Sequence, residues 1–164
     1  MDDLLKQDKM RTKKLPHFQI LLRKAQRGGF TSLFYRLLYR LAANRSHIEI
    51  STKCKIGGGL YIGHAYCITI NVNAQMGRNC NIHKGVTIGQ ENRGTREGCP
   101  TIGDEVWIGI NATVVGNVKI GNDVLIAPNT YVNCDIPDHS VVFGNPCIIK
   151  HKDNATEGYI NNKA

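Results

Sequence analysis

Two histidines lie close to apolar positions of an otherwise regular repeat. Either of them could be a reactive side chain. Around the stretch GLYIGHAYCITI (59–70), aliphatic residues recur every six positions, but inside it the repeat slips by two, from Ile62 to Ile70. His64 stands just before this slip, and His83, in NIHKGVTIG, directly follows an apolar position of the repeat. Imidazole is the natural general base near neutral pH. Either histidine could take a proton from a reacting group, although a lone histidine at a corner can also be structural.

The six cysteines form no C-x-x-C pair, which argues against a zinc ribbon or a redox motif. A small disulfide scaffold would be denser in cysteine, so we expect most of them to be small buried residues in a reducing compartment. The N-terminus MDDLLKQDKM lacks the apolar core of a secretion signal, and no apolar run approaches the roughly 18 to 20 residues that span a bilayer. A cytoplasmic protein is therefore expected.

Positive charge is concentrated in the N-terminal segment. Residues 1–47 hold eleven Lys/Arg and three Asp/Glu, whereas residues 48–164 hold ten of each. Within 15–43, Leu and aromatic residues recur three and four apart, which predicts amphipathic helices interrupted at Gly28-Gly29. The helices are either a cap with solvated basic faces or a peripheral contact for an anionic membrane surface. Nucleic acid is not an expected partner, because no recognition motif accompanies the charge.

From residue 50 onward an aliphatic residue, once Met, recurs every six residues, with two phase breaks. The positions are Ile50, Ile56, Ile62, Ile70, Met76, Ile82, Ile88, Ile102, Ile108, Val114, Ile120, Ile126 and Val132. Three residues after each position, Gly, Asn and Asp dominate, and these residues tolerate a left-handed backbone. A period of six with a turn in each unit predicts short strands stacked in a parallel β-helix. We expect a helical segment at 1–47, the β-helix at 48–149 and a tail at 150–164.

The hexads, together with HIEISTKCKIGGGLYIGHAYCITI, KGVTIG, WIGINATVVGNVKIG and FGNPCIIK, resemble the hexapeptide-repeat acyltransferases. The likeness is to the serine O-acetyltransferase branch and its sugar-acetylating, capsular-polysaccharide relatives. It implies an all-β fold with an α-helical N-terminal segment, namely a left-handed parallel β-helix with three hexads per coil. It also implies transfer of acetyl from acetyl-CoA to a hydroxyl, by a homotrimer or a dimer of trimers.

The resemblance assigns catalytic roles to His64 and Glu49. His64 stands at the position of the family's general base, in the context G-[IL]-x-[IL]-x-H-A. Glu49 stands fifteen residues earlier, where the family has an acid that orients the base. A coil of roughly eighteen residues would place Glu49 near the same corner, one coil below, at the ~4.8 Å spacing of paired strands. The expected catalytic pair is therefore His64 and Glu49.

The acceptor site departs from that of true serine acetyltransferases. The acid that precedes the base and recognises the amino-acid acceptor is replaced by Gly63, and the family's Arg-His-Pro is replaced by Gly98-Cys99-Pro100. Gly63 and Cys99, together with His83 and Lys84, are expected to border the acceptor. Because such polar groups set specificity, we expect a hydroxyl of a sugar or surface-glycan precursor. Serine, in cysteine biosynthesis, is the alternative.

The resemblance also implies where acetyl-CoA would bind, in a groove between neighbouring β-helices of the trimer. The matching positions are Gly89, Gly109-Ile110, Ala127-Pro128 and Lys150. Residues 89–101, at the second phase break, are expected to form a loop over the site.

Two other classes of protein also use a β-helix. A β-helix zinc hydrolyase of the γ-carbonic-anhydrase type needs three converging histidines, but only His64 and His83 lie in the coils at suitable heights, with His139 near the terminal cap. No metal is therefore expected. The last alternative is a non-catalytic β-helix that only assembles partners.

Overall fold

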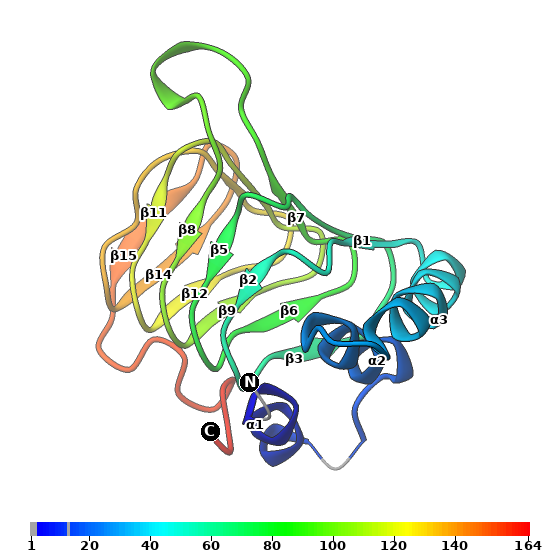
Figure 1. Cartoon of the computed structure of the whole chain (residues 1–164). Helices are drawn as coiled ribbons and strands as arrows, with labels where there is room; N and C mark the ends of the chain where they lie inside the picture. The colour runs from blue at the N-terminus through cyan, green and yellow to red at the C-terminus, as the bar shows by residue number, and fades with distance from the viewer. Residues whose placement is uncertain (1–2, 13) are drawn as a thin grey trace.

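The protein is a triangular β-helix capped at its first coil by helices (Figure 1). The computed structural model describes residues 3–12 and 14–164. Over those residues the strands form three sheets, here called A, B and C, which the chain visits in that order in each coil. All strand pairs are parallel except the last, β14 with β15.

Sheet A contains β1 (Ile48–Ile50), β4 (Ile68–Ile70), β7 (Thr87–Gly89), β10 (Thr113–Val115) and β13 (Tyr131–Val132). Sheet B contains β2 (Lys55–Ile56), β5 (Gln75–Met76), β8 (Thr101–Ile102) and β11 (Lys119–Ile120). Sheet C contains β3 (Tyr61–Gly63), β6 (Asn81–His83), β9 (Val106–Ile108), β12 (Val124–Ile126), β14 (Ser140–Phe143) and β15 (Ile148–His151).

The six-residue repeat builds the interior of this prism. All thirteen aliphatic positions of the repeat are buried, at 5% exposure or less. The corners use the expected turn residues, because Asn79, Asn111, Asp123 and Asn129 have φ between 52° and 58°. Asn and Asp tolerate this left-handed region because their short polar side chains can hydrogen-bond locally. The predicted hexad core is confirmed.

Both phase breaks are insertions at corners. The slip after Ile62 is a bulge at residues 64–67, so that β1 and β4 pair at a spacing of twenty residues, with Ile48 opposite Ile68. The bulge stacks on the corner below it through a hydrogen bond from the Cys67 amide to the Ser46 carbonyl, at 2.9 Å. The second break is a loop that stands out from the prism between β7 and β8 and contains a 3-10 turn, Gly94–Arg96 (Figure 1). The core therefore stays regular while two corners are lengthened.

The N-terminal segment forms α1 (Asp3–Arg11), α2 (His17–Gln26) and α3 (Ser32–Arg45). Helices α2 and α3 are those predicted, and Gly28 and Gly29 between them have φ of 75° and 81°. Helix α1 lies within the helical segment expected at 1–47 but outside the amphipathic pattern at 15–43, because its sequence DLLKQDKMR is mostly charged.

Helix α1 is held by a buried ion pair. The Asp8 carboxylate is fully buried and accepts hydrogen bonds from Arg23 Nε at 2.8 Å, Gln19 Nε2 at 3.0 Å and the Leu60 amide at 2.9 Å. Arg23 also donates to the carbonyls of Ile56 and Gly57. One carboxylate therefore joins α1, α2 and the first coil.

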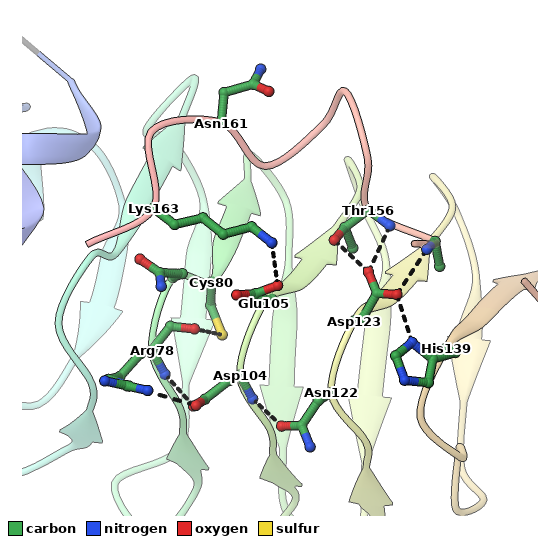
Figure 2. Close-up of polar contacts among 12 residues, drawn as sticks. Arg78, Cys80, Asp104, Glu105, Asn122, Asp123, His139, Thr156, Asn161 and Lys163 are labelled. Atoms are coloured by element: carbon green, nitrogen blue, oxygen red, sulfur yellow. Dashed lines mark hydrogen bonds and ion pairs between the residues drawn. The ribbon is translucent and has the colours of Figure 1, made fainter. Parts of the chain in front are cut away.

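The C-terminal tail returns along the corner between sheets B and C (Figure 2). Asp123 accepts from the Ala155 amide and from both the amide and hydroxyl of Thr156, at 2.7 to 2.9 Å, and His139 Nδ1 lies 2.9 Å from its carboxylate. Burial pushes the pKa of Asp123 upward, but these hydrogen bonds outweigh burial and lower the pKa to about 2. Lys163 pairs with Glu105 further along. The tail is thus attached to this corner by hydrogen bonds and by the buried side chains of Ala155, Thr156 and Ile160.

The prediction for the cysteines is only partly correct. Cys54 and Cys80 are buried, as expected, whereas Cys67 and Cys134 are exposed and Cys99 and Cys147 are half-buried. Cys67 lies in the bulge, whose corner points to solvent. The hexad pattern indicates burial only for cysteines that occupy the inward positions.

Candidate active site

Half of the predicted site residues lie along one edge of the prism, where sheet C turns into sheet A. We call this the C–A edge; it comprises residues 64–67, 84–85, 109–112 and 127–129. Successive corners are joined by hydrogen bonds from the Gly85 amide to the Tyr66 carbonyl, from Asn111 to Lys84 and from Asn129 to Ile110, at 2.9 to 3.0 Å. His64, Lys84 and the expected CoA positions Gly109-Ile110 and Ala127-Pro128 are therefore stacked in consecutive coils.

His64 opens the bulge at the lowest corner of this edge. Its φ is 53°, and its side chain is exposed. Histidine is one of the few residue types enriched in this left-handed region. The imidazole is therefore presented to solvent from a corner fixed by the coils, as an approaching acceptor would require.

Glu49 was expected near the corner below His64. It lies within β1, just after that corner, and pairs in register with Thr69. Its carboxylate accepts a hydrogen bond from the Thr69 hydroxyl at 3.5 Å. Among the described residues the structure contains no hydrogen bond between Glu49 and His64. The orienting role of Glu49 stays a prediction.

His83 lies one coil above Gly63, at the end of β6, and its ring is oriented by the backbone. Nδ1 is 3.0 Å from the Ile108 carbonyl, and because a carbonyl can only accept, Nδ1 carries the proton and Nε2 has a free lone pair. Burial lowers the pKa of His83, and the neighbouring His64 lowers it further, against the hydrogen bond to Ile108. The ring packs on Trp107 with centroids 4.7 Å apart. The His83 ring is thus held in one orientation, with Nε2 placed to accept a hydrogen bond.

The ring of His83 occupies the space that a side chain at position 63 would need. The two residues pair in register, and a Cβ built on Gly63 would lie 2.6 Å from His83 Cδ2 and 2.8 Å from Nε2. An acid before the base is therefore incompatible with His83 in this position. Glycine at position 63 thus leaves the space that the His83 ring occupies.

We expect Gly63→Asp to lower the free energy of unfolding by about 1–3 kcal/mol, because the new side chain overlaps the His83 ring. The loss should shrink when His83→Ala is present, since the clash is removed. Urea unfolding of the two single variants, the double variant and the wild type measures this coupling. Purely additive effects would show that His83 does not fill the position.

A cleft of about 380 Å³ lies beside His83 on sheet C. Its walls include Tyr61, Asn81 and Trp107 from three successive strands and Arg11 and Tyr159 from the two terminal segments. Sequence reasoning missed Tyr61, Trp107 and Tyr159. The six-residue repeat could have identified Tyr61 and Trp107, because each directly precedes an inward-facing isoleucine and must therefore face outward.

The remaining predicted residues do not lie on the C–A edge. Gly89 ends β7 and Cys99 closes the loop, so both lie where sheet A turns into sheet B. Cys99 Sγ contacts Gln90 at 3.7 Å, and burial raises the pKa of its thiol. Lys150 lies on β15, with Nζ 5.7 Å from the centre of the Phe143 ring. Within one chain, these positions and His64 do not form a single site.

Some backbone NH groups at the expected CoA positions already donate hydrogen bonds within the β-helix. A Cβ on Gly109 would lie 2.6 Å from Pro128 N, so the two coils are in close contact there, as predicted from their spacing of eighteen residues. The amides of Gly109 and Ala127, however, already donate to Ile126 and Val142 at 2.8 Å. These two amides are not open to a pantetheine arm, and contacts to it would fall to neighbouring groups of the edge.

Across the described part of the chain, no three His, Cys, Asp or Glu side chains come together in a group that could hold a metal ion. His64 and His83 are neighbours, whereas His139 is bound to Asp123 at the opposite corner of sheet C. The three histidines that a shared zinc site would need do not converge within this chain.

Comparisons with known proteins agree with this fold and with its repeat. A family profile described as bacterial transferase hexapeptide (six repeats) matches residues 99–134. The fold is similar to serine acetyltransferase from Neisseria gonorrhoeae, with a TM-score of 0.67 and 31% identity over 83% of this chain and 54% of that one. Serine acetyltransferase isoform 3 from Entamoeba histolytica, solved with cysteine, gives a TM-score of 0.73 at 26% identity, over 95% and 63%. The chain is a left-handed parallel β-helix, as predicted.

Curated relatives found by sequence similarity are also named serine acetyltransferases. Serine acetyltransferase 4 from Arabidopsis thaliana is 36% identical over 60% of this chain and 28% of its own length. Serine acetyltransferase from Staphylococcus aureus (strain N315) is 37% identical over 68% and 52%. The chain thus spans about half the length of such relatives, or less. Over its repeat region the chain is thus similar to serine acetyltransferases.

Proposed function

We propose that the protein is an acetyl-CoA-dependent O-acetyltransferase in which His64 is the general base. The observation that carries this proposal is the C–A edge. It presents an exposed histidine, in the sequence context of the family's base, one coil below a second oriented histidine and in line with the positions that resemble a CoA site. Relatives named serine acetyltransferases support the reaction class.

The proposed reaction needs little beyond alignment and one base. The acceptor hydroxyl oxygen forms a bond to the thioester carbonyl carbon while His64 takes the hydroxyl proton. The carbon–sulfur bond then breaks, and the CoA thiolate leaves with the proton returned by the imidazolium. His83, oriented by the hydrogen bond from Nδ1 to the Ile108 carbonyl, can accept a second hydroxyl or amide proton of the substrate at Nε2.

We infer a homotrimer, because the proposed site is divided between two edges of one chain. His64 lies on the C–A edge, whereas the loop with Cys99 leaves the corner between sheets A and B. A loop from a neighbouring copy, placed against the C–A edge, would bring the two halves together. This arrangement also agrees with the expected CoA groove between adjacent β-helices.

Serine is the acceptor that the comparisons support best, in preference to the sugar or surface-glycan hydroxyl expected from the sequence. The named relatives support the serine acetyltransferase alternative and do not support the capsular-polysaccharide branch. One observation favours a second candidate, an acceptor without an ammonium group. The His83 ring excludes the acid that would recognise that group, and Cys99 replaces a histidine.

The two candidates are separated by an acceptor comparison. Purified protein is given acetyl-CoA, and CoA thiol release is followed with L-serine, with 3-hydroxypropionate, which is serine without its ammonium group, and with sugars and nucleotide sugars. A serine enzyme should prefer serine over 3-hydroxypropionate by about 10⁴-fold or more, since sites built around a polar group reject analogues lacking it. Equal rates, or release with sugars alone, would favour the second candidate. No acceptor-dependent release with any of them would contradict the proposed function.

A further inference from the structure

Helix α3 presents an apolar stripe to solvent. Phe30, just before the helix, and Leu33, Phe34, Leu37 and Leu41 within it are between 58% and 102% exposed. Their spacing of three and four residues places them on one face of the helix. Large apolar side chains gathered in this way mark a contact surface and not an ordinary solvated helix.

The opposite face of α3 fixes the direction of this stripe. Tyr39 and Ala43 are buried, and the Tyr39 hydroxyl donates to the Ile50 carbonyl of the first coil. Helix α3 also packs along α2. Because the helix is held by its inner face, the stripe cannot rotate into the core of its own chain.

A groove between α2 and α3 continues the stripe. It measures about 670 Å³ and is lined by Leu21, Leu38, Leu41 and Ala42, with His17, Asn44 and Arg45 at its rim. Leu41 belongs to both features. The surface therefore combines a protruding apolar face with an apolar recess beside it, which suits hydrocarbon chains.

The positively charged residues around the stripe indicate what kind of partner it contacts. Residues 15–47 contain six Lys/Arg and no Asp/Glu, and the exposed Arg36, Arg40 and Arg45 are all on α3. Two copies of α3 packed through their stripes would bring these like charges together without a carboxylate from either helix. An anionic lipid surface supplies the missing negative charge and accepts the apolar side chains at the same time.

We propose that α3 is an interfacial helix that docks the protein onto an anionic phospholipid surface. Phe30, Leu33, Phe34, Leu37 and Leu41 enter the boundary between headgroups and acyl chains, and Arg36, Arg40 and Arg45 pair with lipid phosphates. Among the described residues no helix is long and apolar enough to cross a membrane, so the contact is peripheral. This inference does not depend on acetyl transfer.

The test is co-sedimentation of the full chain with phosphatidylcholine vesicles, alone or mixed with phosphatidylglycerol. We expect binding to the mixed vesicles that weakens at high salt, and at least about tenfold weaker binding to phosphatidylcholine alone. Leu37→Asp should weaken binding about ten- to hundredfold, the effect of withdrawing one buried leucine. Arg36→Gln with Arg40→Gln should weaken it about 30-fold.

Val72→Asp is the matched control, because Val72 is an exposed apolar residue outside the helical segment, and this variant should bind as the wild type does. Circular dichroism confirms that each variant is folded. Wild-type protein that binds neither vesicle, or Leu37→Asp protein that still binds, would overturn the proposal. Loss of oligomer mass on Leu37→Asp without any vesicle binding would assign the stripe to a second copy of the chain and would overturn it as well.

Discussion

Replacement of His64 should lower kcat/KM for acetyl transfer by about a thousandfold, the usual contribution of a general base. Two variants separate chemistry from backbone strain. His64→Ala removes the base, but alanine tolerates φ of 53° poorly. His64→Asn removes the base and keeps a residue type that accepts this conformation. Both variants should lose activity alike, and His64→Asn should keep the stability of the wild type.

The matched control is His151→Ala, because His151 is exposed on the last strand, away from the C–A edge, and should leave kcat/KM unchanged. The measurement is the initial rate of CoA thiol release at several acceptor concentrations. Retention of activity by His64→Asn together with its loss in His83→Ala would move the role of base to His83, whose Nε2 is already oriented.

Removal of the Asp8 carboxylate should lower the free energy of unfolding by about 3–5 kcal/mol. Asp8→Ala leaves the guanidinium of Arg23, only 1% exposed, as an unpaired charge between α2 and the first coil. It also leaves the Gln19 amide and the Leu60 NH without their acceptor. Breaking a buried pair is costly because the remaining charge cannot be rehydrated without opening the structure.

Urea unfolding followed by circular dichroism measures this loss. Asp153→Ala is the control, because the Asp153–His151 pair is exposed and such pairs contribute less than about 1 kcal/mol. A loss for Asp8→Ala no larger than that of the control would show that α1 does not depend on the ion pair.

The coils could be predicted because the fold of a β-helix requires a six-residue repeat in its sequence. Each coil repeats the same three corners, so an inward aliphatic residue and a turn residue must recur at fixed spacing, from Ile50 to Val132. The two phase breaks could be located for the same reason, since a corner can lengthen only where the repeat slips. The handedness does not follow from the period and required the resemblance.

The terminal segments were not predictable in this way. Helix α1 is too charged to be recognised by its periodicity and is held by Asp8 pairing with Arg23 from another helix. The tail is held by Asp123, whose partners lie more than thirty residues away at Ala155 and Thr156. Such contacts are tertiary, and no local pattern encodes them.

Individual residues of the candidate site could be predicted from the sequence, but their positions relative to one another could not. The flanks of His64 identify the corner, and the spacing of eighteen residues correctly stacks Gly109-Ile110 beneath Ala127-Pro128. The two-residue bulge, which pairs Glu49 with Thr69, adds to the eighteen-residue coil expected from the repeat, and the orienting role of Glu49 stays a prediction. The fit of His83 against Gly63 could be seen only once the coils were placed.

The most direct test of the account follows the acetyl group itself. Wild-type and His64→Asn protein are each incubated with acetyl-CoA labelled with ¹³C in the acetyl group and with the best acceptor found, and the acceptor is then examined by mass spectrometry. The account predicts an alkali-labile labelled ester on the acceptor with wild-type protein and almost none with His64→Asn. Label released only as free acetate, or equal ester formation by both proteins, would contradict it.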